Sequence, residues 1–136
     1  MKNKTLTVYL ALFLGSLGAH RLYLKGWRDF GFWLHLVATA LGLIGFRRAF
    51  ALGQDDQLSW ALAPFLGISL FAACLAAIVY GLMQEAKWHK AYKGDGASSG
   101  TTVFGVILAL LLGATALMSA IAFAGQRYFE YALKTA

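Results

Sequence analysis

The residues that could do chemistry are concentrated in one polar segment near the N-terminus. His20, Arg21, Lys25, Arg28 and Asp29 follow one another between two runs of apolar side chains. A basic pair such as His20-Arg21 can bind phosphate, but a catalytic centre also needs a nucleophile or a positioned base, and neither is visible. The segment therefore predicts a lipid- or partner-binding loop formed by His20, Arg21, Tyr23, Lys25 and Arg28.

The remaining reactive side chains all have simpler structural interpretations. The single Cys74 lies in an apolar run and excludes an intramolecular disulfide. Asp55 and Asp56 are adjacent carboxylates without a third ligand beside them, so a solvated turn in which Asp56 caps the next helix is favoured over a metal site. Asp29 is likewise interpreted as a helix cap. We therefore predict no enzymatic activity, no metal and no cofactor.

His35 is the candidate polar site within the membrane, because it interrupts the apolar run of residues 30–46. An ionisable residue in a membrane helix is a functional candidate by default, and histidine titrates near physiological pH. This observation supports the alternative that the chain is a small transporter or channel component. The competing interpretation is that His35 hydrogen-bonds the preceding loop or the first helix.

The composition indicates a membrane protein. Of the 136 residues, 60% are hydrophobic, against about 45 to 50% in soluble domains, and the mean hydropathy is +0.63. The formal charge is +6, but the cations occur in ones and twos beside apolar runs. This arrangement favours anionic lipid headgroups as partners and argues against nucleic acid.

Four apolar runs predict an all-α membrane protein with four transmembrane helices arranged as two hairpins. The first run, residues 6–19, would cover only about 21 Å of a hydrocarbon core of about 30 Å. Extending it over residues 5–24 would cross the membrane, and if that helix continued further it would place Arg21, Lys25 and Arg28 on one face. The other runs are residues 30–46, 58–83 and 101–125.

These runs divide the chain into a first hairpin, residues 1–48, a loop, 49–57, and a second hairpin, 58–136. The second hairpin contains a polar loop at 84–100, whose first part is expected to extend the third helix along the interface, and it ends in a short interfacial tail. Small residues let helices approach closely in lipid. The predicted packing positions are Gly15, Gly18, Ala73, Ala77, Gly81, Gly105, Ala109 and Gly113.

The positive charges give little guide to the orientation of the chain in the membrane. Four crossings would place the N-terminus, the second loop and the C-terminus on one side, which divides the Lys and Arg residues six against six and leaves the positive-inside rule undecided. Three cations crowd the short first loop, which favours a cytoplasmic position for the first and third loops.

The polar turn and its flanks resemble the TM2 domain family, in which two transmembrane helices are joined by a short loop. Leu22 replaces the usual Phe of the family signature, and Lys25 is an extra residue before the last glycine. Animal members carry an Asp-Arg-Phe triplet, which here reads His20-Arg21-Leu22, so a receptor-coupling role is not carried over. The residues that fall on the signature are Gly15, Gly18, Ala19, His20, Arg21, Tyr23, Leu24 and Gly26.

The predicted function is that of a non-enzymatic integral membrane protein of the TM2 domain type. It would act through helix packing, lipid contact or regulation of a membrane partner, or as a homo-oligomer. The expected location is the cell membrane, specifically a bacterial cytoplasmic membrane. Because more membrane segments follow the first one, uncleaved insertion is preferred over a signal peptide.

Overall fold

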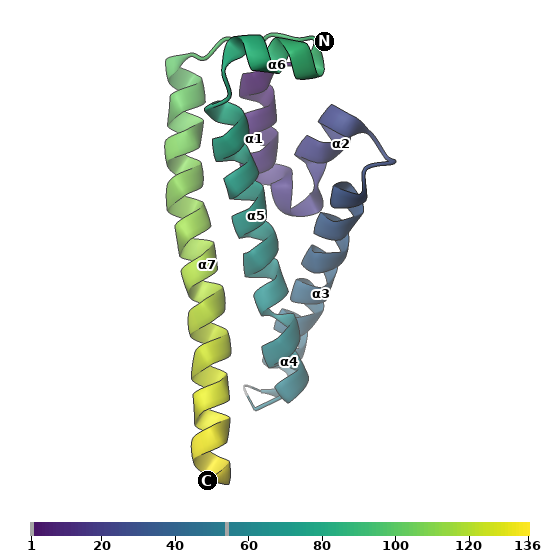
Figure 1. Ribbon diagram of the computed structural model, residues 1–136. Helices are drawn as coiled ribbons and strands as arrows, with labels where there is room; N and C mark the ends of the chain where they lie inside the picture. The colour runs from purple at the N-terminus through teal and green to yellow at the C-terminus, as the bar shows by residue number, and fades with distance from the viewer. Residues whose placement is uncertain (1, 54) are drawn as a thin grey trace.

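The computed structural model describes residues 2–53 and 55–136, and throughout these ranges the regular structure is helical (Figure 1). Its elements in chain order are α1 (Lys4–Leu14), the 3₁₀ helix η1 (Gly15–Leu17), α2 (Ala19–Lys25), α3 (Phe30–Leu52), α4 (Gln57–Leu62), α5 (Pro64–Gly81), α6 (Glu85–Tyr92) and α7 (Gly100–Thr135).

Among the described residues, three helical segments are long and apolar enough to cross a membrane, namely Phe30–Leu52, Gln57–Gly81 and Gly100–Thr135. The 23 residues of α3 cover about 34 Å, enough for the hydrocarbon core. The first apolar helix, Lys4–Leu17, is shorter. The all-helical class and the membrane-spanning character are therefore confirmed, whereas the arrangement of four helices in two hairpins is not.

The first apolar segment reverses direction at Gly18. This residue has φ 76° and ψ 15°, a left-handed conformation that favours glycine. A Cβ atom there would also lie 2.9 Å from the carbonyl oxygen of Phe32. α1 therefore runs only partway along the molecule, and α2 returns toward the end at which α1 begins (Figure 1).

The prediction of one helix over residues 5–24 is therefore wrong, and so is the shared face for its three cations. α2 ends at Lys25, and Arg28 lies in the turn before α3. The apolar pattern did not reveal the break because Gly18 is surrounded by residues that suit a membrane helix.

The other helix boundaries also shift. α3 continues past Arg48 to Leu52, and the third apolar run divides at Ala63 because Pro64 opens a new helix. α6 is a separate helix and not an extension of α5. α7 continues to Thr135, so the aromatic residues predicted to form an interfacial tail belong to its last turns.

The predicted helix caps are confirmed. The Asp29 side chain accepts a hydrogen bond from the Phe32 N–H, and the Asp56 side chain accepts one from the Ser59 N–H. Both bonds satisfy donors that the first turn of a helix leaves unpaired. These caps depend on residues three apart in sequence, which is why local spacing was enough to find them.

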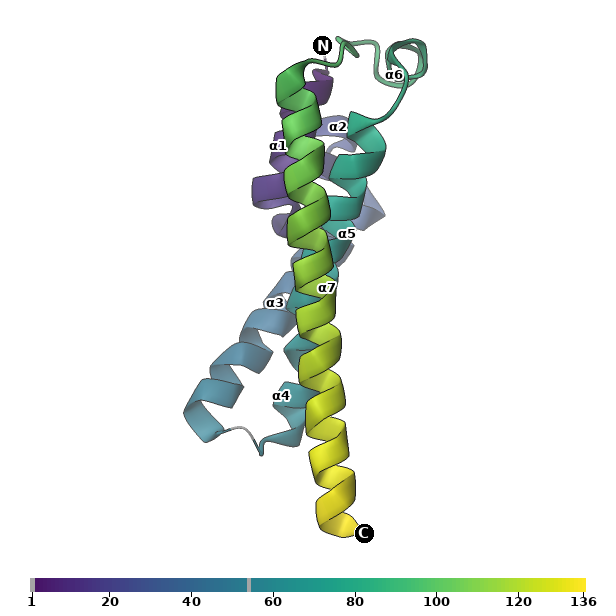
Figure 2. The same cartoon turned by 90° about the vertical axis from the view of Figure 1, so that its left-hand side faces the viewer.

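α5 lies at the centre of the bundle, between α1, α3 and α7 (Figures 1 and 2). Small residues allow the close approach: a Cβ at Gly113 would lie 2.8 Å from the Cys74 Cβ, and one at Gly105 would lie 2.9 Å from Val8. Gly15 meets Ala73, and Gly81 meets Val106, in the same way. The buried core contains Val8, Ala11, Leu12, Cys74, Ala77 and Ala109.

The N-terminus and α6 lie at one end of the molecule, and the C-terminus lies at the other (Figures 1 and 2). The buried Lys4 connects α1 to the segments on either side of α6. Its Nζ donates to the carbonyl of Met83 at 2.8 Å and contacts the Ser98 hydroxyl at 2.6 Å. The Trp88 Nε1 donates to the Lys2 carbonyl at 3.1 Å. We call this the N-terminal end.

Candidate functional site

Some of the polar residues of the TM2-like turn do not lie in an open loop but belong to a partly buried group packed against α5. η1, α2, α3 and α5 each supply a part of it. We call it the hairpin cluster and define it as Ser16, His20, Arg21, Asp29, His35, Thr39 and Ser69.

On one side of the hairpin cluster, hydroxyl groups hydrogen-bond a backbone carbonyl that is exposed by the break in the helix at Gly18. The carbonyl of Ser16 accepts hydrogen bonds from the Thr39 hydroxyl and, at 3.1 Å, from the Ser69 hydroxyl. The two hydroxyls lie 3.1 Å apart. Since an unpaired carbonyl in a membrane interior is costly, α3 and α5 stabilise the reversal of the chain.

The other side of the cluster holds an ion pair between Arg21 and Asp29, with 3.2 Å between Nη1 and Oδ2. Gly31 makes room for it, because a Cβ there would overlap the guanidinium. Burial alone would raise the pKa of Asp29, but the hydrogen bonds from Arg21 and from the Phe32 N–H hold that pKa below its ordinary value. Arg21 is therefore paired within the molecule.

The two histidines of the cluster lie next to each other. His20 is fully buried and His35 is 8% exposed, and their ring centroids are 5.3 Å apart in an edge-to-face arrangement. The Nδ1 of His35 lies 3.2 Å from the Ser69 hydroxyl of α5. The expectation that His35 would bond the preceding loop or the first helix is thus not what the structure shows.

Tyr23 contacts the N-terminal segment. Its hydroxyl accepts a hydrogen bond from the Asn3 N–H at 3.0 Å, and the Lys2 Nζ lies 4.6 Å from the ring centroid. Lys25 and Arg28, by contrast, are exposed. The structure therefore divides the predicted binding loop into three residues with internal contacts, His20, Arg21 and Tyr23, and two exposed cations.

α6 adds exposed cations to the same end; the sequence predicts an interfacial segment here, but the predicted binding residues do not include its lysines. The helix lies at the end of the molecule where α5 ends (Figures 1 and 2), and its Trp88 side chain is fully buried. Lys87, Lys90 and Lys93 are exposed. A buried Trp with lysines on both sides of it is a sequence signal for such an interfacial segment.

At the opposite end most cations are paired with carboxylates. Arg48 makes a two-bond pair with Asp56 at 2.9 and 3.0 Å, and these bonds lower the pKa of the Asp56 carboxyl. Arg127 pairs with Glu130 at 2.9 Å. The remaining cations are Lys134, which lies 3.3 Å from Asp55, and the exposed Arg47.

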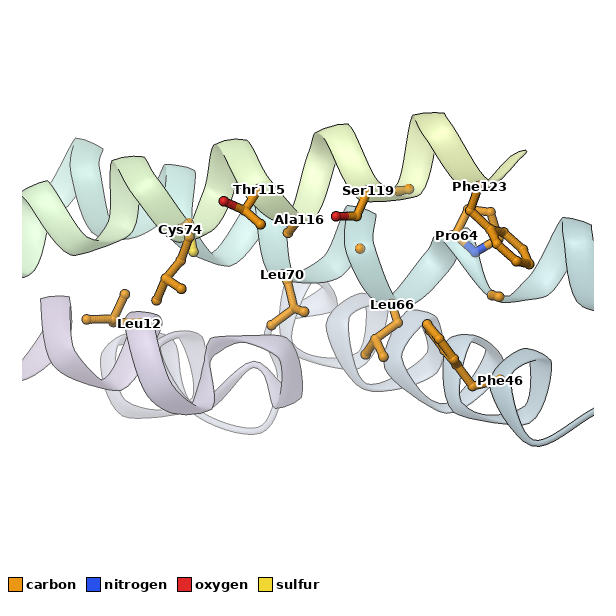
Figure 3. Close-up of a pocket in the computed structure, with 14 residues that line it drawn as sticks. Leu12, Phe46, Pro64, Leu66, Leu70, Cys74, Thr115, Ala116, Ser119 and Phe123 are labelled. Carbon is orange, nitrogen blue, oxygen red and sulfur yellow. The ribbon is translucent and has the colours of Figure 1, made fainter. Parts of the chain in front are cut away.

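A groove of about 550 Å³ separates α3 from α7 over the face of α5 (Figure 3). Its lining is apolar apart from the hydroxyls of Thr115 and Ser119 and the Cys74 thiol. In the part of the chain that the structure describes, no group of three or more His, Cys, Asp and Glu residues could hold a metal ion. The groove is therefore a mostly apolar packing surface.

The long apolar helices and the paired polar residues define a helical integral membrane protein. Within it, residues 1–50 match the family model described as the TM2 domain. The chain thus carries a TM2 domain formed by α1, η1, α2 and most of α3, followed by four helices outside the match. Comparison with the curated proteins and with the solved structures gave no match.

Proposed function

We propose that this chain is a non-enzymatic membrane protein whose N-terminal end binds anionic lipid headgroups. The observation that carries the proposal is that exposed cations that take part in no ion pair are distributed unevenly between the two ends of the molecule. Among the described residues the N-terminal end presents five of them, and the opposite end presents only Arg47. The five are Lys25, Arg28, Lys87, Lys90 and Lys93.

We further propose three membrane crossings, with the TM2 unit forming a re-entrant segment and one crossing. In this arrangement the N-terminus shares a side with the first and third loops, and the Lys and Arg residues divide eight against four. The four are Arg47, Arg48, Arg127 and Lys134. The positive-inside rule then favours a cytoplasmic N-terminal end, the side on which anionic lipids attract basic segments.

The position of α6 supports lipid contact. Trp88 anchors the helix to the bundle, so its exposed lysines face away from the protein core. Each juxtamembrane cation contributes about 1 kcal/mol of attraction to an anionic surface. Glu85 and Asp95 are exposed at the same end and offset part of this attraction, yet the surface remains cationic.

Quenching of tryptophan fluorescence by brominated lipids tests the proposal. Trp27 and Trp33 are exposed near this end, at 67% and 48%. In nanodiscs, brominated phosphatidylglycerol should quench more strongly than brominated phosphatidylcholine, and added salt should reduce the difference. A variant with all five exposed cations replaced by Gln should lose the preference.

Arg47→Gln is the matched control, because it removes an exposed cation at the opposite end. This variant should keep the lipid preference of the native chain. If the five-site variant retained a salt-sensitive preference equal to that of the native chain, the proposal would be wrong.

A further inference from the structure

His20 is the most unusual polar residue in the described structure. Its side chain is fully buried, and neither Nδ1 nor Nε2 has a hydrogen-bond partner. The Nε of Arg21, the next residue, is also buried without a partner. A buried polar atom left unpaired costs about 1 to 3 kcal/mol, so three such atoms in adjacent side chains require an explanation.

The surroundings of His20 are polar on several sides. The titratable and charged groups around it are Arg21 on its own helix, Asp29 before α3, and His35 on α3. From α5, the Tyr80 ring lies 6.3 Å from the His20 ring, and the Tyr92 ring of α6 packs against Tyr80. The backbone of Gly15 is also close, because a Cβ atom built there would lie 3.5 Å from the His20 Nδ1.

Water is the small polar molecule whose hydrogen-bonding capacity matches these unpaired atoms. Buried waters in proteins bind otherwise unsatisfied polar groups, and the imidazole nitrogens together with the Arg21 Nε provide both acceptors and donors. The ion pair of Arg21 and Asp29 connects the site to the surface, because the Arg21 side chain is 31% exposed. A proton carried by water could therefore reach the imidazoles from the headgroup region.

We propose that His20 and His35 form a hydrated proton-binding site in which the two adjacent imidazoles hold a single proton. A hydronium ion gives its proton to a free ring nitrogen and leaves a water molecule. Two imidazolium rings at 5.3 Å beside Arg21 would repel one another, so the pair holds at most one proton. Asp29 is the carboxylate near enough to balance part of that charge.

This site is independent of the proposed lipid surface, since none of the five exposed cations belongs to it. The test is hydrogen–deuterium exchange at the imidazole C2 position, read by mass spectrometry on the native chain in nanodiscs over a pH series. His89 is the internal control because it is exposed on α6. If water reaches the pair, His20 should exchange within about tenfold of the His89 rate.

The shared proton is tested by His35→Gln, which keeps a polar partner for Ser69. In this variant the pH midpoint of His20 exchange should shift while that of His89 stays constant. Exchange at His20 more than about a hundredfold slower than at His89 at every pH would overturn the hydrated site. An unchanged His20 midpoint in His35→Gln would overturn the sharing of the proton.

Discussion

Gly45 shows how one absent side chain sets the distance between two helices. It lies on the face of α3 that meets the junction of α4 and α5, where a Cβ would overlap the backbone of Ala63. Because backbone cannot rotate away, Gly45→Ala should lower the free energy of unfolding by about 1 to 3 kcal/mol. Thermal unfolding in detergent, followed by circular dichroism, measures the change.

Gly125→Ala is the control for that substitution. Gly125 is also helical, but no atom lies within 4 Å of a Cβ built there. Alanine should therefore stabilise α7 by up to about 1 kcal/mol through its better helix propensity. Equal destabilisation by both substitutions would contradict the assigned close approach of α3 to α5.

Asp29 should make the stability of the hairpin depend on acidity. Its folded-state pKa is lowered from the ordinary 3.8 by Arg21 and the Phe32 N–H, against the opposing effect of burial. The ionised carboxylate therefore stabilises the fold above pH 3.8, and this contribution is lost as the pH falls through the lower folded-state value. Unfolding midpoints measured between about pH 6 and 2 should show the loss.

Asp29→Asn keeps a capping oxygen but removes the charge. The variant should be less stable at neutral pH and should lose less stability on acidification than the native chain. Asp56 also has a lowered pKa, so some acid sensitivity should remain. Identical acid profiles for the two chains would show that the ion pair does not contribute.

Residues with local roles were the ones that sequence could identify. Asp29 and Asp56 cap helices through bonds to residues three positions away, and such spacing is visible in the chain itself. The burial of Lys4 and the contact between His20 and His35 were not predicted. Both depend on residues from distant helices, which no local pattern reveals.

At the scale of elements, the reversal at Gly18 decides the shape of the TM2 domain. Gly18→Ala should weaken the α1–α2 hairpin for two reasons, the strain of a left-handed alanine, about 1 to 3 kcal/mol, and the clash with Phe32. Amide hydrogen exchange over residues 4–25 should therefore become faster. Mass spectrometry of peptides from that region measures the change.

Gly26→Ala separates the two causes. Gly26 has φ 78°, but no atom lies within 4 Å of a Cβ built there, so alanine adds strain without a clash. Its effect on exchange should be smaller than that of Gly18→Ala. Because Gly26 has ψ −171°, a conformation that essentially only glycine adopts, the comparison is restricted to exchange over residues 4–17. A larger effect of Gly26→Ala on those residues would contradict the role of Gly18 in the reversal.

The lengths of the later helices could be predicted approximately, because continuous apolar runs indicate membrane helices. The break in the first run could not. Gly15 and Gly18 are equally consistent with close helix packing and with a turn, and the hydroxyls that stabilise the turn come from α3 and α5. A hydrophobic pattern alone does not distinguish a segment that crosses a membrane from one that enters and returns.

At the scale of the whole molecule, the proposed three crossings place the two termini on opposite sides. Single cysteines introduced in a Cys74→Ala background test this with a maleimide that does not cross membranes. Lys2→Cys should react only from the cytoplasmic side, and Thr135→Cys only from the other. Lys90→Cys is the control, because it should react from the same side as Lys2→Cys.

The arrangement of four crossings predicts the opposite result for the N-terminus. If Lys2→Cys and Thr135→Cys were labelled from the same side of the membrane, the chain would have four crossings. The Lys and Arg residues would then divide six against six between the two sides. Sequence was sufficient to identify a helical membrane protein with a TM2 domain. It was insufficient for the number of crossings, which depends on how η1 contacts α5.

The reversal at Gly18 has a consequence for how the chain enters the membrane. The hydroxyl of Ser69 and the methyl group of Ala73, which receive η1, are synthesised about fifty residues after it. In the proposed topology of three crossings, the nascent first segment has no surface on which to rest halfway into lipid during translation. The first segment would therefore stay at the membrane interface, or cross the membrane and later withdraw. It would reach its final position only when α5 has left the ribosome and packs against it.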